Sequence, residues 1–193
     1  MSEQVAGLPV MEFRSAKEWE RWLARHHASS DGVWLKIAKQ GTGVHTVGYP
    51  EAVEAALCFG WIDGLRHKHD EVYFRQRMTP RKARSRWSKI NREKAEALIA
   101  DGRMREAGNR EVEAAKTDGR WDAAYAGQRT IEVPDDLAAA LGRNARARRA
   151  FAALDSRNRY AILYRIHDAK RPETRARRIE QFVTMLAEGR TIH

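Results

Sequence analysis

Residues 51–91 read EAVEAALCFGWIDGLRHKHDEVYFRQRMTPRKARSRWSKIN, and this stretch decides the fold. Small and apolar residues at helical spacing predict a helix over residues 51–59, which Gly60 ends. Alternation of apolar and polar residues then predicts two strands, 61–66 and 72–78, joined by the polar turn 67–71. We therefore expect a helix that leads directly into an antiparallel hairpin.

The stretches on either side predict how this centre is completed. Before it, residues 8–13 favour a short edge strand, a capping box from Ser15 to Glu18 predicts a helix start, and residues 33–38 alternate as a strand. After it, helices are expected up to about Ala100 and over 105–116, and everything beyond Pro134 has helical spacing. The predicted class is α+β, with a small antiparallel sheet and helices in the N-terminal part and an all-helical C-terminal module.

The predicted domain limits follow from this pattern. Residues 1–126 form the α+β domain, residues 127–133 a linker with little hydrophobic pattern, and residues 134–193 the helical module. The chain of 193 residues holds one cysteine, Cys58, so no intrachain disulfide can form. Without a leader-like N-terminus or a long apolar run, we expect a soluble, cytoplasmic protein with no membrane span.

The net charge of +10 is concentrated in two blocks. Residues 66–92 carry ten basic and two acidic side chains, and residues 133–193 carry thirteen and seven. Such blocks attract anions, although an arginine-rich composition alone would also produce them. His67 and His69 lack a third ligand at fixed spacing, so neither a metal nor a cofactor is expected.

A candidate ligand site lies in the first basic block. Arginine forks match the paired oxygens of carboxylates and phosphates, and hydroxyl groups at a helix start add donors toward an anion. Two tryptophans would form the walls of this corner, and Asp63 would orient an arginine across the hairpin. The residues expected to bind ligand are Trp61, Asp63, Arg75, Arg77, Arg81, Ser85, Trp87, Ser88 and Asn91. The alternative is an Asp–Arg pair that only fastens the hairpin to the next helix.

Three functions are compatible with these residues, and the oligomeric state is not predicted. The first is binding of an anionic or amphipathic small molecule or peptide at the corner. The second is an enzyme in which Asp63 is the general base, although no known catalytic motif is present. The third is nucleic-acid binding without sequence preference through the basic blocks, which is less favoured because no nucleic-acid-binding signature appears.

Several long motifs resemble the YdeI/OmpD-associated family, also labelled bacteriocin-protection proteins. They are AVEAALCFGWIDG at 52–64, TPRKARSRWSKIN at 79–91, GRM at 102–104, AKTDGRWDAAY at 115–125 and AKRPETR at 169–175, with Arg178 and Ile179. The resemblance implies a bacterial role in protection against bacteriocins or envelope stress, and it implies no catalytic mechanism. Met78 and Gln40 depart from the family pattern, in which we expect phenylalanine and lysine.

Overall fold

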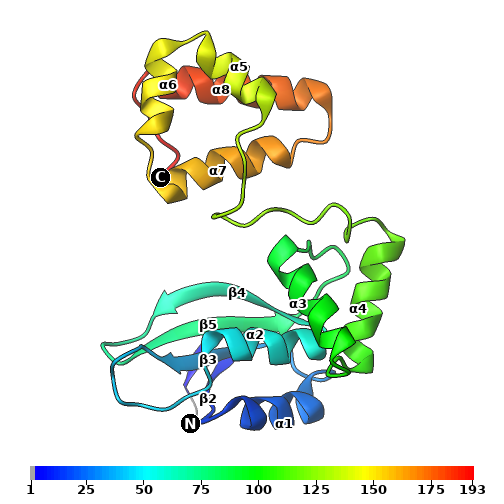
Figure 1. Ribbon diagram of the computed structural model, residues 1–193. Coiled ribbons are helices and arrows are strands. Elements are labelled where there is room, and N and C mark those ends of the chain that lie inside the picture. Colours follow the sequence, from blue (N-terminus) through cyan, green and yellow to red (C-terminus); the bar gives the residue numbers. More distant parts are fainter. Residues whose placement is uncertain (1–2) are drawn as a thin grey trace. The chain divides into compact units, whose positions relative to one another are not determined.

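The computed structural model describes residues 3–193, which divide into two compact units (Figure 1). The first unit holds the described residues up to Trp87 together with Asn91–Ala124, and the second holds Ser88–Ile90 and Tyr125–His193. Each unit has its own hydrophobic core. The predicted α+β class is confirmed. The expected domain limits, 1–126, 127–133 and 134–193, stay a prediction.

Five strands form one sheet in the order β1-β2-β3-β5-β4. Their bounds are β1 Gln4–Val5, β2 Leu8–Glu12, β3 Val33–Ala38, β4 Trp61–Lys68 and β5 Tyr73–Pro80. β2 and β3 are parallel, and the other neighbours are antiparallel. The expected edge strand near residues 8–13 is β2, which has neighbours on both sides because the two-residue β1 forms the edge instead.

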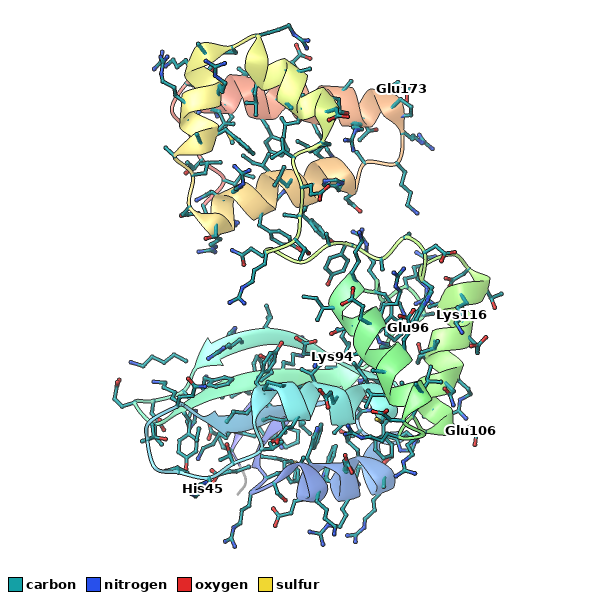
Figure 2. All side chains as sticks on the ribbon, in the orientation of Figure 1. His45, Lys94, Glu96, Glu106, Lys116 and Glu173 are labelled. Atoms are coloured by element: carbon teal, nitrogen blue, oxygen red, sulfur yellow. The ribbon has the colours of Figure 1, made fainter. Side chains whose placement is uncertain are left out.

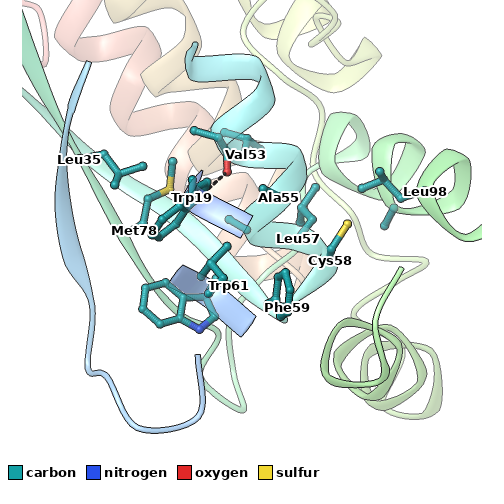
Figure 3. Close-up of a cluster of buried hydrophobic side chains, with 14 of the residues drawn as sticks. Trp19, Leu35, Val53, Ala55, Leu57, Cys58, Phe59, Trp61, Met78 and Leu98 are labelled. Atoms are coloured by element: carbon teal, nitrogen blue, oxygen red, sulfur yellow. Dashed lines mark hydrogen bonds between the residues drawn. The ribbon is translucent and has the colours of Figure 1, made fainter. Parts of the chain in front are cut away.

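One face of the sheet supplies the core of the first unit. Val33, Leu35 and Ile37 of β3 are buried on this face, in a cluster with residues of α1 (Ala16–His26) and α2 (Tyr49–Cys58). Figure 3 shows Trp19 of α1 beneath α2, and its indole N–H donates to the carbonyl of Ala52 at 3.1 Å. The predicted cap of α1 is also present, since Ser15 Oγ accepts from the backbone N–H of Glu18.

Close approach of two helices depends on a glycine. α3 spans Lys89–Ala100 and α4 spans Glu106–Thr117, close to the expected ranges. A Cβ atom at Gly108 of α4 would lie 2.6 Å from the carbonyl oxygens of Leu57 and Cys58 at the end of α2. Only glycine therefore permits this packing of α4 against α2.

The second unit contains four helices around a separate core. They are α5 (Asp135–Gly142), α6 (Ala145–Ala152), α7 (Ser156–His167) and α8 (Pro172–Ala187). Asn144 and Asp155 cap α6 and α7 through their side chains. Asn158 is buried and accepts from the backbone N–H groups of Ile192 and His193, which fixes the chain that follows α8.

Candidate functional site

The hairpin places Asp63 on the core side of the sheet. In β4, Asp63 lies opposite Met78 of β5, and residues that pair across antiparallel strands share a face. Asp63 is half-buried, and its Oδ2 accepts a hydrogen bond of 2.7 Å from the hydroxyl of Tyr49, the first residue of α2. The expected arginine partner of Asp63 is therefore wrong, because its partner is a tyrosine.

Arg75 and Arg77 lie on the opposite face of the sheet. Arg77 is paired with Trp34, and Arg75 forms an ion pair of 3.3 Å with Glu3. Trp34 is itself buried, and its indole N–H donates to the carbonyl of Val5. The sheet therefore separates these two arginines from Asp63, which is why the expected pairing does not form.

The turn after β5 brings together three of the expected residues. Arg81 is buried, and its guanidinium carbon lies 3.5 Å from the ring centre of Trp87. Ser85 closes the turn, since its Oγ accepts from the N–H of Lys82 and its carbonyl accepts from Arg120. These contacts hold the turn against the core.

The two expected indole walls lie in the core. Trp61 is 1 % exposed and donates its indole N–H to the carbonyl of His27, while Trp87 is 2 % exposed and contacts Trp121. Neither ring face is free for a ligand to cover, so the picture of two walls around a hollow is wrong.

Ser88 and Asn91 lie at the start of α3, where Ser88 bridges to Tyr125. A ligand-binding role for these nine residues stays a prediction.

A pocket of about 410 Å³ lies beside the Tyr49–Asp63 pair, and we name it the hairpin pocket. Its polar side chains are those of Tyr49, Lys39, Gln40 and Arg66, and Phe74 supplies an aromatic wall. The remaining lining residues are Ile37, Ala38, Gly48 and Pro50. An apolar wall with a few converging polar groups is typical of small-molecule sites.

Two cations in this pocket lack an acidic partner within residues 3–193. The Arg66 guanidinium lies 3.6 Å from the ring centre of Phe74, and no ion pair involves it among those residues. The Lys39 ammonium donates to the carbonyl oxygens of Asp70 and Glu71 at 2.7 and 3.1 Å, which fixes its position without cancelling its charge. The hairpin pocket can therefore stabilise a negative charge next to an aromatic ring.

A β-bulge explains why the sequence pattern misses this grouping. The register shifts between Asp63 and Arg66, and the amide of the buried Gln76 donates to the carbonyl oxygens of Gly64 and Leu65 inside the bulge. Arg66 consequently pairs with Gln76 and lies on the same face of the sheet as Asp63. Without the bulge, strict alternation would place Leu65 and His67 on that face instead. The sequence does show a helix start at Tyr49-Pro50 and a basic block that contains Arg66. It does not show the strand register, which brings these two segments to the same pocket.

Two further pockets lie apart from the expected residues. One, of about 500 Å³, is lined by residues of α1 and α4. The other, of about 600 Å³, lies between α5 and α8, where Asp136 binds Arg175 through two hydrogen bonds of 2.5 and 2.9 Å. This guanidinium lowers the pKa of the Asp136 carboxyl, and the carboxylate raises the pKa of Arg175.

Within the part of the chain that the structure describes, neither a metal site, a reactive thiol nor a membrane-spanning helix is found. No group of three His, Cys, Asp or Glu residues there is arranged to hold a metal ion. Burial raises the pKa of the Cys58 thiol, which makes it a poor nucleophile. No helix in residues 3–193 is both long enough and apolar enough to cross a membrane.

Two family models match separate parts of the chain. A domain of unknown function (DUF8412) matches residues 11–111, and the model described as "Bacteriocin-protection, YdeI or OmpD-Associated" (OmdA) matches residues 130–189. Neither the curated proteins nor the solved structures gave a match. The expected resemblance is confirmed for the C-terminal part, whereas the quoted motifs at 52–64 and 79–91 lie in the segment that the first model matches. The chain therefore belongs to the DUF8412 family through residues 11–111, and its C-terminal part matches the bacteriocin-protection, YdeI or OmpD-associated family.

Proposed function

We propose that this bacteriocin-protection-like protein is a binding protein that takes an anionic or amphipathic small molecule or peptide into the hairpin pocket. One observation carries the proposal: Arg66 and Lys39 line the pocket without an acidic partner among residues 3–193, beside the ring of Phe74. A carboxylate would satisfy the two cations while its apolar body contacts the aromatic wall.

Asp63 acts in this proposal as a positioning residue. It accepts a hydrogen bond of 2.7 Å from the Tyr49 hydroxyl, which fixes the orientation of that hydroxyl in the lining of the hairpin pocket. The arginine fork gives two parallel donors, and its flat face is already stacked on Phe74. A ligand with a planar carboxylate on an apolar or aromatic body therefore matches the groups that the hairpin pocket presents.

Calorimetric titration with 2-naphthoate tests the proposal, with 2-naphthol as the matched neutral probe. We expect 2-naphthoate to bind, and the Arg66→Gln variant to bind it about tenfold more weakly because one charged hydrogen-bond partner is lost. Arg84→Gln is the matched control, since Arg84 is exposed in the same basic block and does not line the hairpin pocket. Equal binding of both probes, or equal weakening by both substitutions, would overturn the proposal.

The protective role needs a test in cells. A bacteriocin-sensitive strain that expresses the wild-type chain should survive a bacteriocin challenge better than the same strain with an empty vector. The Arg66→Gln variant should lose part of this protection, while Arg84→Gln should retain it. Protection that is identical for all three chains would separate the protective role from the hairpin pocket.

A further inference from the structure

The pocket of about 500 Å³ between α1 and α4, named here the α1–α4 pocket, gathers basic side chains from distant parts of the sequence. Lys17 and Arg21 come from α1, and Arg105 and Arg110 come from the start of α4. None of these residues lies in the two basic blocks of the sequence. The fold therefore creates a positive site that the distribution of charge along the chain does not indicate.

Four basic and two acidic residues line the pocket, so its lining carries a net charge of +2. Of its two acidic residues, Glu106 forms an ion pair of 2.8 Å with Arg110, and Glu20 lies 3.8 Å from Arg103. Figure 2 marks Glu106 at the start of α4. Lys17, Arg21 and Arg105 form no ion pair with any residue from 3 to 193. Three cations of the lining are therefore not ion-paired, while Glu20 contributes one negative charge to the same lining.

The inner wall of the pocket is apolar. Phe59 is only 9 % exposed, and Ala24 and Ala107 line the same pocket. The ring of His27 lies 5.4 Å from the ring of Phe59, centre to centre, and its Nδ1 is hydrogen-bonded to the carbonyl of Leu23. Cations around an apolar wall suit a ligand with an anionic head and a small apolar body.

We propose that the α1–α4 pocket binds a phosphate group carried on a small apolar or aromatic body. A carboxylate carries one negative charge and two acceptor oxygens, whereas a phosphate monoester carries nearly two negative charges at pH 7 and three acceptor oxygens. The net lining charge of +2 matches that charge, and arginine forks match the oxygen geometry. The pocket is also lined by the first turn of α4, whose N–H groups favour anions.

Calorimetric titration of the full chain with phenyl phosphate tests this site, with phenylacetate as the carboxylate probe. We expect phenyl phosphate to bind, more weakly as salt is added, and phenylacetate to bind at least about tenfold more weakly. The Arg21→Gln substitution should weaken phenyl phosphate binding about tenfold through the loss of one charged donor. Arg25→Gln should leave it unchanged, because Arg25 lies one turn further along the same helix and does not line the pocket.

Three results would overturn the proposal: no binding of phenyl phosphate, equal binding of phenylacetate, or equal weakening by Arg21→Gln and Arg25→Gln. The melting temperatures of Arg21→Gln and Arg25→Gln should equal that of the wild type. Any difference in binding between them then comes from the pocket and not from a loss of folded protein. Arg66→Gln should not affect phenyl phosphate binding, which separates this site from the hairpin pocket. Vesicles with and without phosphatidic acid distinguish the source of the phosphate, since a lipid headgroup requires vesicle binding and a free phosphate does not.

Discussion

The guanidinium carbon of Arg81 lies 3.5 Å from the ring centre of Trp87, and both side chains are buried. Arg81 also donates from Nη1 to the carbonyl of Arg86 at 3.3 Å, and its backbone N–H donates to the carbonyl of Gly60. A buried cation needs such contacts because leaving water is costly. The backbone bond joins the turn after β5 to the residue that follows the end of α2, while the side-chain contacts fasten Arg81 within the turn, and this second role can be measured.

Replacing Arg81 by leucine should destabilise the first unit by about 1–3 kcal/mol, because the contact with Trp87 and the hydrogen bond to Arg86 are lost. All six tryptophans lie in this unit, so tryptophan fluorescence during urea unfolding reports on it alone. The exposed Arg84 provides the control, and Arg84→Leu should change the unfolding free energy by less than about 0.5 kcal/mol. Similar effects of the two substitutions would show that the contact with Trp87 contributes no stability.

A second prediction concerns the buried Asn158 in α7. Its Oδ1 accepts from the backbone N–H groups of Ile192 and His193 at 3.1 and 2.9 Å, and its Nδ2 donates to the carboxylate of Asp155. Asn158→Ala should cost the second unit about 1–3 kcal/mol, because buried donors and acceptors lose their partners. Amide hydrogen exchange at Ile192 and His193 should become faster in the variant.

The control for Asn158 is the exposed Arg157 on the same helix turn. Arg157→Ala should leave the exchange of Ile192 and His193 unchanged, because no hydrogen bond joins its side chain to residues 3–193. Protection of both amides that survives Asn158→Ala would show that the end of the chain is held by other contacts, such as the packing of Ile192 on the second core.

The ion pair of Asp136 and Arg175 predicts a pH dependence. The hydrogen bonds from Arg175 lower the pKa of Asp136 in the folded state, so this pair stabilises the fold above the unfolded pKa of about 3.9. That contribution is lost as the pH falls through the folded pKa. Because the Asp136 side chain is 45 % exposed, solvent screening keeps the contribution small, about 1 kcal/mol or less.

Urea unfolding of wild type and Asp136→Asn, followed by far-UV circular dichroism, measures this dependence. The wild type should be the more stable chain at pH 7, and the difference should shrink toward pH 3 as Asp136 is protonated. High salt should reduce the difference at pH 7 as well, since exposed ion pairs are screened. A difference that is constant from pH 7 to pH 3 would mean that the ionised carboxylate is not the stabilising group.

The sequence predicts local structure well because hydrophobic spacing and caps act over a few residues. The cap at Ser15, the helix break at Gly60 and the hairpin that follows are all found. The partner of Asp63 could not be predicted, because it depends on which face each strand presents and on the bulge before Arg66. The hairpin pocket and the α1–α4 pocket are each lined by segments that are distant in the sequence. Tertiary packing brings these segments together, and a single sequence does not reveal that packing.

The last prediction tests the approach of α4 to α2 at Gly108. A Cβ atom there would lie 2.6 Å from the carbonyl oxygens of Leu57 and Cys58, and backbone atoms cannot move aside cheaply. Gly108→Ala should therefore destabilise the first unit by about 1–3 kcal/mol, although alanine is the better helix former. Tryptophan fluorescence during urea unfolding measures the change.

Gly142 offers the matched control, because it ends α5 and a Cβ atom built there meets nothing within 4 Å. Because the second unit holds no tryptophan, its unfolding in urea is followed by far-UV circular dichroism. Gly142→Ala should be neutral or stabilise that unit by up to about 1 kcal/mol, through the smaller conformational freedom of the unfolded chain. The two substitutions thus make the same chemical change, but only Gly108→Ala is expected to destabilise the protein. A stabilising Gly108→Ala would show that α4 can move away from α2 at little cost.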